Sequence, residues 1–350
     1  MKRNIFVTHM VLIRADANET IGTGHVMRCL SIAKAFRTHG AEVLFITADH
    51  KSDQLISNAG FSSACLDGNW SDLPEELPKL TGILEELRPE LLLVDSYYVT
   101  DEYLKKLRRH APVAYIDDVN KQTWDVDWLV NYNIYAESYD YGGYAGKRTG
   151  LLLSPRFAPL REEFRDPGTH AINSTVSNVL VSAGGSDPER ITERMISEIC
   201  PEWPDIRFHF VVGGLNPRIS KIRALESGNV VLHIDEKHMS SLMKAADVAI
   251  SAAGSTLYEL CACGTPTITY TLADNQLDAA KAFERQGIMV YAGDCRENDR
   301  FINDLEESFR DLINDVSRRT SCSEKMQALV DGSGAERIAE AMLQQTTGRY

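Results

Sequence analysis

The chain has 350 residues, of which 43% are apolar and 25% are charged, a composition typical of soluble globular proteins with one or two hydrophobic cores. Its 37 Lys and Arg residues against 50 Asp and Glu residues give a net charge of −13. Such a charge repels phosphate backbones and anionic lipid surfaces, which argues against a nucleic-acid or membrane-surface role. No run of about 18 uninterrupted apolar residues occurs, so we expect no membrane insertion and a cytoplasmic protein.

The seven cysteines form no CxxC pair and no Cys/His cluster with the spacing of a zinc site. Their number is odd, and their sequence contexts resemble the interiors of helices and strands, which predicts reduced, buried thiols. No carboxylate pair of the DxD type accompanies the glycine-bearing loops described below. We therefore expect no bound metal and no cofactor, and nothing in the sequence implies a protein partner.

The first half of the chain alternates short apolar strands with amphipathic helices. We expect strands over 10–14, 41–47, 61–66, 91–95 and 113–116, and helices over 26–38, 53–58, 77–87 and 101–109. Continuous apolar strands separated by helices indicate a parallel sheet that is covered on both faces. Residues 132–150 show no helical period, and residues 166–177 are polar with Pro, Gly and Ser, which is typical of a linker.

The same alternation restarts after the linker. We expect strands over 178–183, 206–212, 230–232, 248–251, 266–270 and 288–291, and helices over 188–199, 217–225, 240–246, 255–263 and 276–286, with a helical tail from 301. The chain is therefore expected to be α/β, with two doubly wound Rossmann-type domains, 1–165 and 178–350, facing each other across a cleft. Whether the tail crosses back over the first domain stays open.

The loop after the first strand contains the most informative residues of the first half. Gly22 and Gly24 allow the backbone to approach a ligand closely, and a helix begins at about His25. The loop lacks the Lys-Ser/Thr pair of a P-loop, and Met27 occupies the place of the third glycine of a dinucleotide-binding fingerprint. Turn geometry alone is the alternative explanation for the two glycines.

His25 is the candidate general base. The positive end of the helix dipole disfavours an imidazolium there, and Arg28 lies one turn further on the same face. We therefore expect a neutral ring that can accept a proton near pH 7. A histidine that caps its own helix, or that packs under the loop, is the alternative interpretation.

Three strand-to-helix loops of the second half have the features of a site for a phosphorylated ligand. The candidate residues are Gly184, Gly185, Ser186 and Asp187 in the first loop, Gly254, Ser255, Thr256 and Glu259 in the second, and Asn275 and Gln276 in the third. Amides and hydroxyls at helix starts favour a diphosphate, and Glu259 could accept both hydroxyls of a ribose. A capping box of Thr256 with Glu259 is the alternative for the second loop, and simple helix capping is the alternative for the third.

These loops resemble the GT-B superfamily of nucleotide-sugar enzymes. The run 251–266, SAAGSTLYELCACGTP, with Asn275 and Gln276 after it, is similar to the UDP-sugar site of the peptidoglycan N-acetylglucosaminyltransferase. The run 14–30 closely resembles one family of the superfamily, the UDP-2,4-diacetamido-2,4,6-trideoxy-β-L-altropyranose hydrolases of pseudaminic acid biosynthesis, with their spore-coat polysaccharide relatives. Segments 94–98, 116–118 and 181–187 agree with this family too, and the Gly-x-Gly-His-x-x-Arg block is the most specific part of the match.

The resemblance implies that water hydrolyses a UDP-linked diacetamido-trideoxy sugar, with release of UDP, inversion at the anomeric carbon and no required metal. The catalytic histidine of the family falls on His25, and the substrate contact in its Asn-Gln motif falls on Asn275. Tyr97 is expected either to shape the sugar pocket or to serve packing alone. The chain departs from the family by an additional N-terminal decapeptide and a longer helical tail.

Two other functions are consistent with parts of the same pattern. A GT-B glycosyltransferase would pass the sugar of a UDP-sugar donor to an alcohol, and it would need an acceptor groove or an apolar patch that the acidic composition does not favour. A non-catalytic nucleotide-sugar-binding protein would share the loops without turnover. In each case the expected partner of the chain is a small-molecule UDP-sugar.

Overall fold

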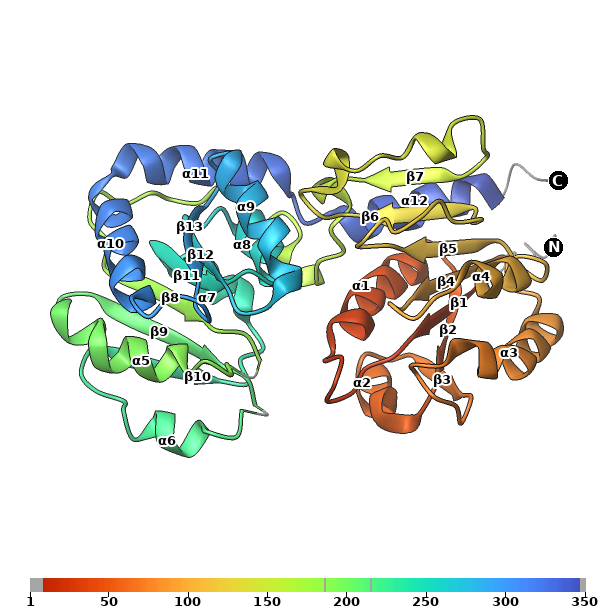
Figure 1. Ribbon diagram of the computed structural model, residues 1–350, viewed down its shortest axis with the longest axis horizontal. Helices are drawn as coiled ribbons and strands as arrows, with labels where there is room; N and C mark the ends of the chain where they lie inside the picture. Colours follow the sequence, from red (N-terminus) through yellow and green to blue (C-terminus); the bar gives the residue numbers. More distant parts are fainter. Residues whose placement is uncertain (1–8, 186, 215, 347–350) are drawn as a thin grey trace, which may run out of the picture. The chain divides into compact units, whose positions relative to one another are not determined.

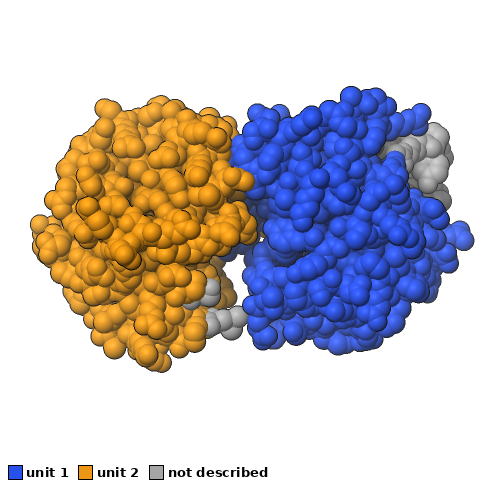
Figure 2. All heavy atoms as spheres, in the orientation of Figure 1, with its two compact units in different colours: residues 1–161, 333–350 blue, residues 162–332 orange. Residues whose placement is uncertain are grey.

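The computed structural model of the chain describes residues 9–185, 187–214 and 216–346. Helices alternate with parallel strands over much of this part of the chain (Figure 1). The chain divides into two compact units, Met1–Arg161 with Ser333–Tyr350, and Glu162–Gly332, which Figure 2 shows in different colours. No helix within the described ranges is long and apolar enough to cross a membrane.

Unit 1 is built on a seven-stranded parallel sheet with the order β3-β2-β1-β4-β5-β6-β7. Its strands are β1 (Met10–Ala15), β2 (Glu42–Thr47), β3 (Ser62–Cys65), β4 (Leu91–Asp95), β5 (Val113–Ile116), β6 (Trp128–Asn131) and β7 (Gly150–Leu153). Its helices are α1 (Gly24–Thr38), α2 (Asp53–Asn58), α3 (Leu73–Leu87), α4 (Asp101–Leu107) and α12 (Gly334–Thr346). All five residues of β4 are buried, as expected for a central strand that is covered on both faces.

Unit 2 is built on a six-stranded parallel sheet with the order β10-β9-β8-β11-β12-β13. Its strands are β8 (Asn178–Ser182), β9 (Arg207–Val212), β10 (Val230–Ile234), β11 (Val248–Ala252), β12 (Thr267–Thr271) and β13 (Val290–Asp294). Its helices are α5 (Ile191–Glu198), α6 (Ile219–Arg223), α7 (Met239–Ala245), α8 (Thr256–Cys263), α9 (Leu277–Arg285), α10 (Phe301–Asn314) and α11 (Val316–Leu329). The buried stripe of α10 packs Phe301, Leu305 and Phe309 into the core of this unit.

The two expected doubly wound sheets are thus present, but they divide the chain differently from the boundaries drawn on the sequence. The polar segment 166–177 lies inside unit 2, and the end of the tail belongs to unit 1. There α12 packs against α1 (Figure 1). His39 at the end of α1 contacts Glu336 of α12 at 3.2 Å, and the Arg337 guanidinium donates to the carbonyl of Arg156 at 2.9 Å.

Strands β6 and β7 were not expected from the sequence. The runs Trp128–Asn131 and Gly150–Leu153 have four residues each, which is too short for a period to stand out. No helix joins them within this described stretch; two 3₁₀ turns, Ala136–Ser138 and Gly142–Tyr144, lie between them instead. The absence of a helical period over 132–150 therefore reflects a real irregular connection and not the end of the sheet.

Gly334 gives a test of the attachment of α12. A Cβ on this residue would lie 2.2 Å from the carbonyl oxygen of Ala158, and backbone cannot move aside as a flexible side chain can. We expect Gly334→Ala to lower the free energy of unfolding by about 2 kcal/mol. Gly82→Ala is the matched control, because Gly82 lies within α3 and a Cβ on it would meet nothing within 4 Å, and it should stabilise by about 0.5–1 kcal/mol. Urea unfolding measures both, and a neutral Gly334→Ala would contradict the packing.

A buried ion-pair network lies beneath the carboxyl end of β1. Arg14 is completely buried, and its guanidinium donates two hydrogen bonds of 2.7 Å to the carboxylate of Glu76 in α3 and one of 2.5 Å to Asp16. The Tyr103 hydroxyl donates to Glu76 at 2.7 Å, and Asp16 accepts the amide of Ala48 at 2.7 Å. The network ties α3 and α4 to the sheet immediately before the loop that leads to His25.

Candidate active site

The candidate catalytic residues of unit 1 lie where the strand order of its sheet reverses. Strand β1 pairs with β2 on one side and with β4 on the other, so the loops after β1 and β4 leave the sheet next to each other. Such a topological switch point is where open α/β sheets bind their ligands. His25 lies in the first turn of α1, which follows β1, and Asp95 is the last residue of β4.

His25 is hydrogen-bonded to Asp95 across this point. The His25 Nδ1 atom lies 2.7 Å from Asp95 Oδ1, and the two side chains are 8% and 1% exposed. Because the carboxylate only accepts, Nδ1 carries the proton and Nε2 keeps its lone pair in the neutral ring. No hydrogen bond among the described residues uses Nε2. The ring therefore does not cap its helix, and its orientation is that of a general base held by a carboxylate.

Arg28 connects this pair to a second carboxylate. Its guanidinium donates two hydrogen bonds of 2.6 Å to Asp95 and one of 2.9 Å to Asp118, which follows β5. It also donates to the Tyr132 hydroxyl at 2.8 Å; burial raises the pKa of Tyr132 to about 12, so this phenol stays neutral. Because these three partners engage the guanidinium, the geometry favours Arg28 as a residue that holds Asp95 and Asp118 in place over one that contacts the substrate.

Tyr97 lies against the candidate base. Its ring is 4.7 Å from the His25 ring at an interplanar angle of 75°, and its hydroxyl donates to Asp118 Oδ2 at 3.0 Å. Burial and the neighbouring Asp118 raise the pKa of Tyr97, so the hydroxyl remains a donor. The residue is nevertheless 47% exposed. This combination of a fixed hydroxyl and an exposed ring favours a role in shaping a pocket over packing alone.

Asp95 stays ionised in this environment. Burial alone would raise the pKa of its carboxyl, but the charges and hydrogen bonds of Arg28 and His25 outweigh burial and hold that pKa well below the usual value of 3.8. A group with a lowered pKa in the folded state stabilises the fold above its ordinary pKa, and it loses that contribution as the pH falls toward the folded-state value.

Acid is therefore expected to destabilise unit 1 through Asp95. We expect the urea midpoint of unfolding to fall more steeply between about pH 5 and pH 3 in the wild type than in Asp95→Asn. Other carboxyl groups titrate in both proteins, so the difference between the two slopes is the quantity that reports on Asp95. Equal slopes would show that the carboxylate gains nothing from its two cationic neighbours.

The expected glycines of the first loop are in place. Gly22 has a left-handed backbone with φ +70°, and its amide donates to the Asn18 carbonyl at 2.8 Å. Gly24 begins α1, one residue earlier than expected. Both are exposed, and a Cβ at either would meet nothing within 4 Å. Gly22 is thus required by its turn, and the space beside both glycines is compatible with a ligand.

The first loop of unit 2 differs from the expectation. Helix α5 begins at Ile191, three residues after Pro188, and the Asp187 carboxylate accepts the amides of Ile191 and Thr192 at 2.8 and 3.0 Å. Asp187 is 1% exposed. The start of α5 is therefore already capped by the protein, and it is not free to bind a diphosphate.

The glycines of this loop remain candidates. Gly184 and Gly185 are exposed, with φ +76° at Gly184, while Ser186 lies outside the described residues. Gly213 lies close against this loop. A Cβ on Gly213 would lie 2.7 Å from the Gly185 carbonyl oxygen, so the close contact depends on the absence of a side chain at Gly213.

The second loop of unit 2 agrees better with an anion site. Strands β8 and β11 are neighbours at the point where the order of this sheet reverses, and Gly254 precedes Ser255, the N-cap residue of α8. The N-cap residue Ser255 makes no capping hydrogen bond with its side chain, and it is exposed. Thr256 and Glu259 are half-buried in the first turn. Among the described residues the Ser255 hydroxyl and the Ser255 and Thr256 amides make no hydrogen bond, whereas the Leu257 and Tyr258 amides already donate to backbone. Unpaired hydroxyls and amides at the start of a helix are the groups that bind phosphate.

In the third loop the Gln276 side chain stabilises the turn, whereas the Asn275 side chain is exposed. The Gln276 side-chain oxygen Oε1 accepts a hydrogen bond of 2.8 Å from the Leu272 amide and so closes the turn before α9. Asn275 is exposed beside it, in the 3₁₀ turn Asp274–Gln276. Strand β12 is the neighbour of β11, so Asn275 and Ser255 follow adjacent strands at the same edge of the sheet.

Asp95, Asp118 and Tyr132 belong to the site although they were not among the residues predicted for it. Open α/β sheets bind ligands at the loops that follow their strands, here the loops after 91–95 and 113–116. Asp95 ends a strand that is otherwise apolar, and this position could have indicated a site residue. The pairing of Asp95 with His25 was out of reach of the sequence, because 70 residues separate them. It depends on β4 lying beside β1.

Comparisons with known proteins confirm the stated resemblance. Residues 179–341 match the model of the glycosyltransferase family 28 C-terminal domain. The spore coat polysaccharide biosynthesis protein SpsG of Bacillus subtilis is 26% identical over 352 residues, which span 95% of this chain and 97% of that protein. The UDP-2,4-diacetamido-2,4,6-trideoxy-beta-L-altropyranose hydrolase of Campylobacter jejuni is 26% identical over 262 residues, which span 71% of this chain and 86% of that protein.

Solved structures of other proteins share this fold. MurG of Acinetobacter baumannii is 12% identical with a TM-score of 0.68, and the match covers 96% of this chain and 99% of that structure. The UDP-GlcNAc 2-epimerase of Neisseria meningitidis is 15% identical with a TM-score of 0.65 and a coverage of 96% and 100%. At these identities the likeness concerns the fold alone. The chain therefore has the GT-B fold, with two Rossmann-like sheets, and its C-terminal half matches the C-terminal domain of glycosyltransferase family 28.

Proposed function

We propose that this chain is an enzyme that hydrolyses a UDP-linked 2,4-diacetamido-2,4,6-trideoxy sugar to the free sugar and UDP, in nonulosonic (pseudaminic) acid biosynthesis. The observation that carries the proposal is the 2.7 Å contact between His25 Nδ1 and Asp95, which leaves Nε2 as a base. The name of the Campylobacter jejuni relative supplies the substrate class. The fold supplies only the expectation of a nucleotide-linked sugar.

In the proposed reaction His25 Nε2 takes a proton from a water molecule. The water oxygen attacks the anomeric carbon on the face opposite the diphosphate, the bond from that carbon to the diphosphate oxygen breaks, and the configuration inverts. Asp95 stabilises the imidazolium that forms, and Arg28 holds Asp95 in place. The Tyr97 ring and hydroxyl shape the site for the sugar.

Unit 2 is proposed to hold the nucleotide. The amides and hydroxyls of Ser255 and Thr256 at the start of α8 would take the diphosphate, and would stabilise the charge that develops on UDP without a metal ion. Glu259 is proposed to accept the ribose hydroxyls, and Asn275 to contact the sugar. Asp187 and Gln276 are left out of this set, because their side-chain oxygens are bound to backbone amides.

The test is incubation of the protein with the UDP-sugar and no acceptor, in water enriched in ¹⁸O. Equal amounts of UDP and free sugar, with no ¹⁸O in the UDP, are the expected products, because attack at carbon leaves the diphosphate oxygens unchanged. ¹⁸O in UDP would mean attack at phosphorus and would contradict the role of His25 as proposed.

A glycosyltransferase that uses the same donor is the second candidate, and the match to glycosyltransferase family 28 favours it. It would release UDP at a high rate only after an alcohol acceptor is added. A nucleotide-sugar-binding protein without catalysis would bind the UDP-sugar and release no UDP under either condition.

A further inference from the structure

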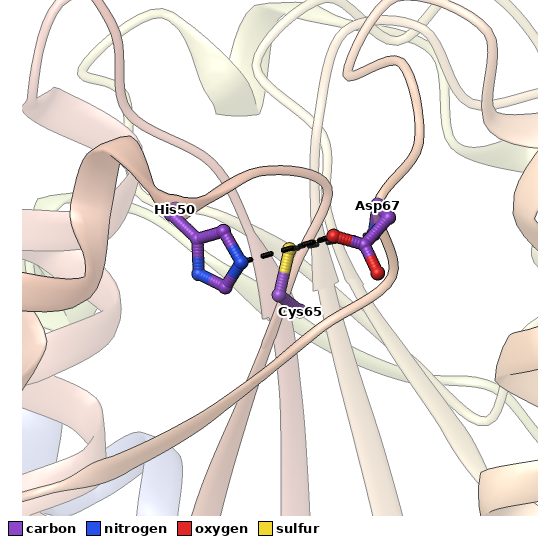
Figure 3. Close-up of side chains that lie close together, drawn as sticks. All are labelled: His50, Cys65 and Asp67. Carbon is purple, nitrogen blue, oxygen red and sulfur yellow. Dashed lines mark hydrogen bonds and ion pairs between the residues drawn. The ribbon is translucent and has the colours of Figure 1, made fainter.

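A second cluster of reactive side chains lies at the same sheet edge, away from the residues discussed above. His50 follows β2 in a 3₁₀ turn, Cys65 ends β3, and Asp67 lies two residues further on. Figure 3 shows the Cys65 sulfur between the His50 ring and the Asp67 carboxylate. The catalytic proposal uses none of these three residues, and β3 is an edge strand of the sheet.

The three potential ligand atoms have the spacing of a zinc site. They lie within 4.8 Å of one another, with 3.6 Å between Cys65 Sγ and Asp67 Oδ1, and 3.7 Å between His50 Nε2 and Asp67 Oδ1. Zn–S bonds of about 2.3 Å and Zn–N or Zn–O bonds of about 2.0–2.1 Å place the ligands of a tetrahedral ion roughly 3.3–3.6 Å apart. Small rotations of two exposed side chains are enough to reach these values.

His50 has the outer-sphere partner that metal-binding histidines have. Its Nδ1 lies 2.6 Å from Asp53 Oδ2, and Asp53 is itself held by the Ser63 hydroxyl, which donates at 2.9 Å. This bond places the proton on Nδ1 and turns the lone pair of Nε2 toward Asp67. A carboxylate behind the imidazole fixes the tautomer and increases the basicity of the ligand.

The local backbone also organises the cluster. Asp67 has a left-handed conformation with φ +48°, and its amide donates to Cys65 Sγ at 3.3 Å. Burial and the nearby Asp67 carboxylate raise the pKa of the Cys65 thiol, so a metal ion has to displace the thiol proton in order to bind the thiolate. The other six cysteines are buried, so Cys65 is the thiol that an ion from solvent can reach.

We propose that His50, Cys65 and Asp67 bind one Zn²⁺ ion, with water in the fourth position. The donor set of one imidazole, one thiolate and one carboxylate favours Zn²⁺ over Mg²⁺ or Ca²⁺, which take oxygen ligands. The ion would join the turn after β2 to the end of β3 and so hold the edge of the sheet. The sequence-based expectation of no metal did not include this set, because its members come from two loops. The proposal does not rest on the proposed hydrolysis.

The test uses Co²⁺ as a visible substitute for Zn²⁺, added to reduced protein from which any affinity tag has been removed. The wild type should bind one Co²⁺ per chain with a thiolate-to-cobalt absorption band, and Zn²⁺ should displace it. Cys65→Ser should lose the band, and His50→Ala and Asp67→Asn should each weaken binding. Asp53→Asn should weaken it about 10-fold through the orientation of His50. His238→Ala is the matched control, since His238 is exposed in unit 2, and it should bind as the wild type does.

Thermal unfolding provides a second readout. Zn²⁺ at a saturating concentration should raise the Tm of the wild type and of His238→Ala, and should leave that of Cys65→Ser unchanged. Circular dichroism checks that each variant is folded. A thiolate band that survives in Cys65→Ser, equal weakening by His238→Ala and His50→Ala, or the lack of saturable binding to the wild type would each overturn the proposal.

Discussion

His25→Asn is expected to lower the turnover number for UDP release at least about 100-fold while the affinity for UDP stays unchanged. The reason is that Asn has no basic nitrogen, although it can still accept or donate a hydrogen bond toward Asp95. The affinity is unaffected in this proposal because UDP binds to the loops of unit 2. Steady-state release of UDP gives the rate, and calorimetric titration with UDP gives the affinity.

The matched control for this variant is His39→Asn. His39 is an exposed histidine at the other end of the same helix, so the exchange repeats the chemical change without removing the candidate base. It should keep wild-type turnover. Asp95→Asn should lower turnover as well, because an amide in place of the carboxylate no longer fixes the Nδ1–H tautomer of His25. Undiminished turnover in His25→Asn would remove the imidazole from the mechanism.

Glu76→Ala is expected to lower the free energy of unfolding by about 3–5 kcal/mol. Arg14 is fully buried, and two of its hydrogen bonds are made to Glu76. Removal of that carboxylate leaves most of a positive charge without compensation in the core, and Asp16 replaces only part of it. Burying a charge without its partner costs more than losing the pair altogether. Urea unfolding of the two proteins at neutral pH measures the difference.

Two further variants separate the charge from other effects at this position. Glu75→Ala changes the exposed neighbour of Glu76 in the same turn of α3, and it should change the stability by at most about 0.5 kcal/mol. Tyr103→Phe removes one hydrogen bond to Glu76 and should cost about 1 kcal/mol. A loss in Glu76→Ala no larger than that in Tyr103→Phe would show that the ion pair contributes little.

The proposed hydrolysis and glycosyl transfer differ in one reactant, water or an alcohol, so a shared fold is expected for both. What selects the reaction is the group that activates the nucleophile and the space left for it. In this chain that group is proposed to be His25, held by Asp95, beside the exposed ring of Tyr97.

Much of the secondary structure could be predicted because it depends on local pattern. The strands 91–95 and 113–116 and the helix 53–58 have the expected bounds in the structure. The predicted bounds of a helix are wrong where a short polar segment determines the residue at which the helix begins. Helix α5 begins three residues late because Asp187 caps it from a loop, and α1 begins one residue early at Gly24. The placement of α12 against α1 could not be read from its own sequence, since 297 residues separate His39 at the end of α1 from its partner Glu336 in α12.

The amino-acid order by itself determined that a histidine lies in the first turn of the helix after the first strand, behind a glycine-bearing loop. It also determined that the chain forms two arrays of parallel strands. These features depend on neighbours within a few residues. Only the tertiary structure decided which groups His25 and His50 meet. Asp95 reaches His25 because β4 pairs with β1, and Cys65 reaches His50 because β3 pairs with β2. The choice of strand partner is a non-local event, governed by how the whole sheet buries its apolar faces, and no local pattern encodes it.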